Sequence, residues 1–153
     1  MILLNTNKLC VRTELLTENI FVDTNPLIYI LDEFVPFSDK TNSFFEAKIL
    51  TGAEFYTSTI TDAEFIVKPL IEHQFNKIDL YYRFLASCDF SKCVINENVA
   101  SRSAHIRAKY KNIKLADALQ LAAAIEYNCQ IFLTNDKRLK QVSEIQVVLV
   151  DEL

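Results

Sequence analysis

The stretch IFVDTNPLIYIL, residues 20–31, carries the strongest structural signal in the chain. Its first three residues form a short apolar run typical of a buried strand, and Asp23 ends that run. Asn25 before Pro26 is typical of a helix start, with asparagine as the N-cap and proline as the first helical residue. The stretch therefore predicts a strand followed at once by a helix over residues 26–31, with Asp23 at the junction.

The same alternation of short apolar runs and amphipathic segments continues to the end of the chain. Continuous apolar strands that alternate with helices indicate a mostly parallel sheet covered on both faces, so we expect an α/β fold. We therefore predict an N-terminal extension over residues 1–18 and a single domain over residues 19–153. The predicted strands are residues 20–22, 54–57, 93–95, 130–134 and 147–150, and the predicted helices are residues 26–31, 38–50, one from residues 58–61 through Glu64, 75–87, 97–110, 115–127 and 137–140.

Length and composition restrict the class of protein. A chain of 153 residues, half of them apolar, fits one domain with a sizeable core. No apolar stretch approaches the roughly 20 residues that cross a bilayer, and the N-terminus does not read as a signal peptide. The four cysteines form no CxxC pair, which with no export signal favours reduced thiols in the cytoplasm.

Two histidines far apart in sequence, and no cluster of cysteine with histidine, leave no basis for a zinc site. Any metal would be held by carboxylates, which favours Mg²⁺ or Mn²⁺. The net charge of −4 argues at first against a nucleic-acid partner, but the charge is unevenly distributed. Residues 102–140 hold eight basic and three acidic residues, a balance of +5, against 8 basic and 17 acidic residues, a balance of −9, elsewhere. A basic segment of this kind suits a polyanion, and equally a solvated helix face.

Three acidic side chains follow predicted strands. Asp23 follows the first strand, Glu64 comes a helical turn or two after the second, and Asp136 follows the fourth. A fourth, Asp117, begins a helix among apolar neighbours. In open α/β sheets the site forms beyond the carboxyl ends of the strands, where four carboxylates would repel one another unless cations shared the site. Mg²⁺ prefers such oxygen ligands, and metal-assisted phosphodiester hydrolysis uses them.

Each acid also has a purely structural interpretation, which the residues alone leave open. Asp23 suits a turn before a helix, and Glu64 suits a capping box that begins at Thr61. Asp117 suits the positive end of a helix dipole, and Asp136 suits the N-cap of the short helix after it.

Four segments, taken in order, resemble the PIN-domain family: FVDTN at 21–25, STITDAE at 58–64, KLADA at 114–118 and LTND at 133–136. The resemblance covers about residues 19–150 and implies a three-layer α/β/α sandwich with a mostly parallel central sheet. It also implies an endoribonuclease that uses one or two Mg²⁺ or Mn²⁺ ions. The family's pattern carries over Asp23, Glu64, Asp117 and Asp136 as catalytic, metal-binding acids, with Asn25 and Thr134 as accessory polar residues.

Small members of the family, the VapC-like toxins, are often the toxin half of a toxin–antitoxin pair. The resemblance therefore implies an RNA substrate, an antitoxin protein that covers the site, and a homodimer. Two departures stand out: 22 residues precede Asp23, and the chain is acidic overall. Our hypothesis is that Arg102, Lys137 and Arg138 hold the RNA backbone, and the alternative is that they are ordinary surface charges.

Other functions fit the sequence less well. A haloacid-dehalogenase-type phosphatase needs a second aspartate two residues after the first, where this chain has Asn25. A response-regulator receiver needs an acceptor aspartate on a later strand, and the strand that ends at Thr57 offers none. The remaining alternative is a catalytically inactive PIN-like module that binds RNA or protein. Loss of an acid would indicate such a module, and all four acids are present.

Overall fold

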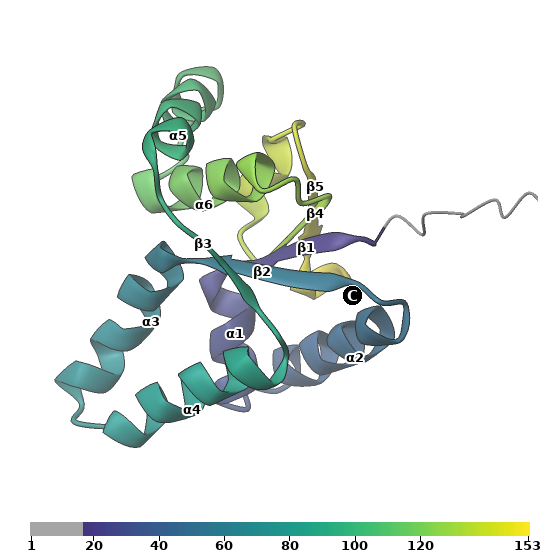
Figure 1. The fold of residues 1–153 in the computed structure, drawn as a ribbon, viewed down its shortest axis with the longest axis vertical. Coiled ribbons are helices and arrows are strands. Elements are labelled where there is room, and N and C mark those ends of the chain that lie inside the picture. The colour runs from purple at the N-terminus through teal and green to yellow at the C-terminus, as the bar shows by residue number, and fades with distance from the viewer. Residues whose placement is uncertain (1–16) are drawn as a thin grey trace, which may run out of the picture.

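The computed structural model describes residues 17–153 (Figure 1). All but the last two residues of the expected extension, 1–18, lie outside the described residues, and the single domain over residues 19–153 stays a prediction. The elements are β1 (Asn19–Val22), α1 (Thr24–Leu31), α2 (Phe37–Leu50), β2 (Glu54–Ser58), α3 (Thr59–Ile71), α4 (Phe75–Ser87), β3 (Ser91–Cys93), α5 (Glu97–Lys109), α6 (Leu115–Glu126), β4 (Ile131–Thr134), the 3-10 helix η1 (Lys137–Gln141), β5 (Gln146–Leu149) and the 3-10 helix η2 (Val150–Glu152).

The five strands form one parallel sheet in the order β3-β2-β1-β4-β5. From β1 the chain moves outward through β2 to β3, and then crosses to the other side of β1 to add β4 and β5. The strand order therefore reverses between β1 and β4, which is where open α/β sheets form their crevice.

Alternate residues of each strand face opposite layers of helices. Phe21 and Phe132 pack on the side of α5 and α6, and Ile20, Val22 and Leu133 pack on the side of α1 to α4. Figure 1 shows the sheet between these two groups of helices. The arrangement confirms the predicted three-layer α/β/α sandwich. Within residues 17–153, no helix combines the length and the apolar character needed to cross a membrane.

The start of α1 differs from the prediction. The N-cap is Asp23, whose Oδ1 accepts a hydrogen bond from the backbone N of Thr24 at 2.7 Å, and Pro26 is the third helical residue. The prediction of Asn25 as N-cap was therefore wrong by two residues. Proline is tolerated here because the first four backbone N–H groups of a helix have no partner within it. The consequence is that Asp23 is held at the first turn of α1 by the backbone itself.

Phe132 provides a test of the packing of the central strands. Its ring stacks on Phe21 of the adjacent strand, with centroids 5.1 Å apart and planes within 5°, and both side chains are fully buried. We expect Phe132→Ala to lower the free energy of unfolding by about 3–5 kcal/mol, because it leaves a cavity at the centre of the sheet. Urea denaturation measures this. Leu50→Ala, at a side chain that is 88% exposed, should stay within about 0.5 kcal/mol of wild type, and equal losses in the two variants would contradict the assigned core.

Candidate functional site

The four predicted acids line one cleft at the carboxyl ends of β1 and β4. Asp23 follows β1 directly, and Asp136 lies two residues beyond β4. Glu64 comes from α3, and Asp117 lies in the first turn of α6. The cleft has a volume of about 200 Å³, and Thr24, Asn25 and Ile28 of α1 complete its lining. The structure thus gathers side chains that are up to 113 residues apart in sequence at the point where the strand order reverses.

Asp23 is the most deeply buried of the four acids, with 6% of its surface exposed. Its Oδ1 accepts hydrogen bonds from the backbone N of Thr24 at 2.7 Å and from Gln120 Nε2 at 3.1 Å, and Oδ2 accepts one from Thr134 Oγ1 at 2.7 Å. Burial raises the pKa of Asp23 to about 6 against the lowering effect of the hydrogen bonds from Thr134 and Thr24, and repulsion from the nearby acids adds to the rise. The site therefore contains a carboxylate whose ionised form is costly.

Glu64 does not form the capping box that its sequence context suggests. The N-cap of α3 is Ser58, whose side chain accepts a hydrogen bond from the backbone N of Ile60, so the helix begins too early for Glu64 to reach back to its start. Glu64 Oε2 instead accepts hydrogen bonds from the Thr24 hydroxyl and from Gln120 Nε2, the latter at 2.9 Å. The carboxylate is consequently aimed at the end of β1.

Asp136 and Asp117 both face the guanidinium of Arg138. Asp136 caps η1, accepting from the backbone N and the Nε of Arg138, each at 2.9 Å, and the same guanidinium lies 3.8 Å from Asp117 Oδ2. Hydrogen bonding to Arg138 lowers the pKa of Asp136. Burial and the charge of Asp136 raise the pKa of Asp117, and Asp117 Oδ2 is buried with no hydrogen-bond donor among residues 17–153. One carboxylate oxygen at the cleft is therefore unsatisfied.

The donor set fits a hard divalent cation. Only oxygen ligands face the cleft, as Mg²⁺ and Mn²⁺ prefer, and the undonated Asp117 Oδ2 is a buried anionic oxygen that a cation would stabilise. As the side chains stand, no three acidic, histidine or cysteine residues within 17–153 are grouped closely enough to hold an ion. Glu64 turns instead to Thr24 and Gln120, and Asp136 turns to Arg138.

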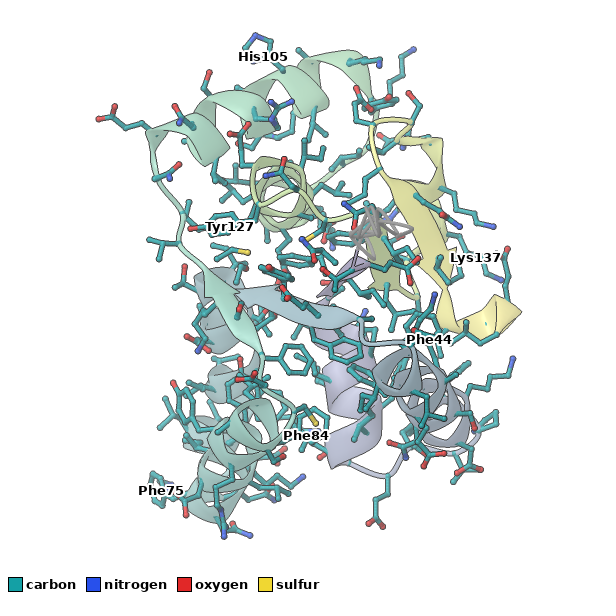
Figure 2. All side chains as sticks on the ribbon, turned by 45° about the vertical axis from the view of Figure 1, so that its right-hand side comes forward. Phe44, Phe75, Phe84, His105, Tyr127 and Lys137 are labelled. Atoms are coloured by element: carbon teal, nitrogen blue, oxygen red, sulfur yellow. The ribbon has the colours of Figure 1, made fainter. Side chains whose placement is uncertain are left out.

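The three basic residues of the RNA hypothesis do not lie together. Arg138 borders the cleft through Asp136 and Asp117. Lys137 pairs with Asp151 at 3.1 Å, whereas Arg102 pairs with Glu126 and lines a separate hollow on α5 and α6. Figure 2 shows this separation. His105, which lines the same hollow as Arg102, extends from α5 at one end of the molecule, whereas Lys137 lies at the β5 side of the sheet.

Two residues near the acids were not identified from the sequence. Gln120 of α6 is fully buried and donates to both Asp23 and Glu64. Its signal was present, since it is the one polar residue between Ala118 and Ile125 and lies three residues after Asp117, on the same helix face. Lys114, the residue before α6, lies close enough to lower the pKa values of Asp117 and Asp136. Neither role follows from a motif, because each depends on how the helix is docked.

Comparisons with known proteins agree with this geometry. The family model of the PIN domain matches residues 20–145. No curated protein matches the chain. Solved structures do: a chain in the crystal structure of VapBC2 from Rickettsia felis bound to a DNA fragment from their promoter has a TM-score of 0.69 and 18% sequence identity, covering 86% of this chain and 98% of that chain.

Two further structures have similar scores. A chain of a toxin-antitoxin complex from Klebsiella pneumoniae has a TM-score of 0.65 and 25% identity, covering 88% of this chain and 99% of that chain. A chain of DNA-bound VapBC from Salmonella typhimurium has a TM-score of 0.66 and 15% identity, with coverage of 88% and 99% respectively. These likenesses establish a shared fold over most of the chain.

The raised pKa of Asp23 predicts how stability depends on pH. Between its ordinary pKa of 3.8 and about 6, the folded protein binds the proton more tightly than the unfolded chain, so the free energy of unfolding falls as pH rises through that window. In EDTA, wild type should lose about 2 kcal/mol relative to Asp23→Asn between pH 4 and pH 7. Urea denaturation of both proteins at each pH measures the difference. Asp39→Asn, at an exposed carboxylate on α2, is the control, and parallel pH curves for wild type and Asp23→Asn would contradict the assignment.

Proposed function

The chain belongs to the PIN domain family, and from that membership we propose that it is a metal-dependent endoribonuclease that hydrolyses RNA phosphodiester bonds. The observation that carries the proposal is the cleft at the carboxyl ends of β1 and β4, which Asp23, Glu64, Asp117 and Asp136 line together. Three of these acids also serve as caps or as first-turn residues of helices. Helix capping does not require that they share one cleft, and metal-assisted hydrolysis does.

The four carboxylates would hold one or two Mg²⁺ or Mn²⁺ ions. When bound, the metal supplies a more acidic water as nucleophile and neutralises the charge that develops on the phosphoryl oxygen. Asn25, which lines the cleft, offers an amide to a polar group of the substrate, and Thr134 keeps Asp23 in place through its hydrogen bond to Oδ2. Metal binding needs the ionised carboxylate of Asp23, whose pKa burial raises to about 6. A bound cation would favour that ionised form and so lower the pKa again.

We further propose that the chain is the toxin of a toxin–antitoxin pair, works in the cytoplasm as a homodimer, and is inhibited by an antitoxin protein that covers the cleft. The structural neighbours that are toxin-antitoxin complexes support this setting.

The α3–α4 hairpin supports a protein partner, since Leu70, Ile71 and Phe75 are about half exposed or more. Phe75 lies at the outer end of the hairpin in Figure 2. The free thiols of Cys88, Cys93 and Cys129 suit a reducing compartment.

The decisive test is cleavage of a mixed pool of structured RNAs by the purified protein, freed from any co-purified partner. We expect cutting with Mg²⁺ or Mn²⁺ that EDTA abolishes. Asp23→Asn should reduce the rate by about a hundredfold or more, because it removes a metal-binding carboxylate while keeping the size of the side chain.

Asp39→Asn is the matched control, since it removes an exposed carboxylate outside the cleft and should cleave like wild type. If wild type cuts no RNA with either metal across pH, the inactive RNA- or protein-binding module replaces the nuclease. If Asp23→Asn and wild type cut equally, the activity does not belong to this cleft.

The basic residues can be tested by RNA binding without cleavage. In the Asp23→Asn background, replacing Arg102, Lys137 and Arg138 with alanine should weaken the binding of single-stranded RNA. Each phosphate contact contributes about −0.7 to the slope of log affinity against log salt. Losing all three contacts should make the slope shallower by about 2, and by about 1.4 if Arg102, in its separate hollow, makes no contact. Fluorescence anisotropy over a salt series measures it.

A second triple variant, with Lys40, Lys48 and Arg83 replaced by alanine, removes the same charge from α2 and α4. It should leave the slope nearly unchanged. Equal reductions in the two variants would mean that only net charge matters, and the proposed contacts would then be ordinary surface charges.

A further inference from the structure

Within residues 17–153, Gln120 is the one side chain that donates hydrogen bonds to both Asp23 and Glu64. Its side chain is fully buried at the face where α6 meets the end of the sheet. The amide nitrogen lies 3.1 Å from Asp23 Oδ1, 2.9 Å from Glu64 Oε2 and 3.2 Å from Thr24 Oγ1. An amide nitrogen has two hydrogens, and the Thr24 hydroxyl already donates to Glu64. The two carboxylates are therefore the acceptors that this amide satisfies best.

The two carboxylates, which only accept hydrogen bonds, fix the orientation of the amide, and a hydroxyl group contacts its oxygen. Gln120 Oε1 accepts a hydrogen bond from Thr61 Oγ1 at 3.0 Å, and Thr61 Oγ1 accepts one from Thr57 Oγ1 at 2.9 Å. All three side chains are fully buried. The reversed amide would direct its oxygen at two carboxylates and leave the Thr61 hydroxyl facing an N–H group. The carboxylates therefore select the orientation, and the buried Thr61 hydroxyl holds the amide oxygen in it.

We propose that Gln120 is the positioning residue of the metal centre: its amide joins one oxygen of Asp23 to one oxygen of Glu64 and so fixes how the two carboxylates are oriented at the cleft. The inference rests on the proposed function, because it assumes that these acids bind the metal. A neutral amide suits the task. It satisfies one oxygen of each carboxylate and adds no positive charge that would compete with the ion, whereas a lysine or arginine at the same place would neutralise the acids.

The distribution of hydrogen bonds leaves ligand oxygens available. Both hydrogen bonds that Glu64 accepts within the described structure go to Oε2, so Oε1 keeps its lone pairs for a cation. Asp23 accepts three hydrogen bonds of the roughly four that a carboxylate can take, two at Oδ1 and one at Oδ2. Gln120 therefore orients both acids without using up their capacity to bind metal.

The test measures Mn²⁺ binding directly, by electron paramagnetic resonance of the free ion, in wild type, Gln120→Met and Thr61→Val. Methionine keeps the length and apolar stem of glutamine but makes no comparable hydrogen bonds. We expect the Mn²⁺ dissociation constant of Gln120→Met to rise about ten- to hundredfold, as is usual when a partner of a metal-binding side chain is removed. Thr61→Val should raise the constant less, because it removes only the hydroxyl that holds the amide oxygen.

The double variant distinguishes positioning from general destabilisation. If Thr61 acts through Gln120, adding Thr61→Val to Gln120→Met should raise the constant no further. In cleavage assays the Mg²⁺ concentration for half-maximal rate should rise for Gln120→Met, while the rate at saturating Mg²⁺ stays within a few-fold of wild type.

Other outcomes overturn the inference. A folded Gln120→Met protein that binds Mn²⁺ within twofold of wild type would show that Gln120 only packs the core, and the proposed nuclease would stand. Should Gln120→Met not fold, an unchanged dissociation constant in Thr61→Val would have the same meaning. Wild-type protein that binds no Mn²⁺ would overturn the metal centre and this inference with it.

Discussion

Repulsion among four carboxylates at one end of a parallel sheet is the constraint that organises the structure around the cleft. Each acid is held by a group that lowers the cost of its charge. The backbone N of Thr24 and the Thr134 hydroxyl donate to Asp23, Gln120 donates to both Asp23 and Glu64, and the Arg138 guanidinium faces Asp136 and Asp117. These partners do not offset the cost completely: burial first, and the nearby acids second, still raise the pKa of Asp23, and Asp117 Oδ2 has no hydrogen-bond donor within residues 17–153. The remaining excess of negative charge is the feature that would favour a bound cation in the proposed metal centre.

The parallel sheet by itself accounts for most of this arrangement. A parallel sheet brings the ends of all its strands to one edge, and the reversal of strand order between β1 and β4 opens a crevice there. Helices begin at that edge, so residues that cap them also face the crevice. Asp23 caps α1, Asp136 caps η1 and Asp117 lies in the first turn of α6. The structural and the functional interpretations of these acids are therefore compatible, because the same backbone that needs a cap positions the carboxylate.

The sequence was sufficient to predict the fold and to select the four acids that line the cleft, because both depend on local patterns, whereas the catalytic role of these acids stays a prediction. Apolar runs alternate with helical periodicity, and each acid lies just beyond a strand or at a helix start. It was insufficient where the outcome depends on docking. The cap of α1 was placed at Asn25, but the end of β1 brings Asp23 into position first, and Glu64 was open to a capping role that Ser58 performs. Arg102 was grouped with Lys137 and Arg138 by charge, yet α5 carries it to a separate hollow beside Glu126. Gln120 faces the acids only because α6 packs across the sheet.

The contrast between Gln120 and Arg138 indicates how such a cleft can be stable and still bind an ion. Arg138 is a strong counter-ion for two acids, but its side chain is 46% exposed, so water screens its ion pairs and limits what they contribute to stability. Gln120 carries no charge but is fully buried, where a hydrogen bond is strong and an unsatisfied donor is costly. The buried neutral partner therefore sets the geometry of Asp23 and Glu64, and the exposed charged partner compensates charge at the rim. If the two partners exchanged places, a buried guanidinium would compete with a metal ion for Asp23 and Glu64. The observed placement avoids that competition, as the proposed metal centre requires.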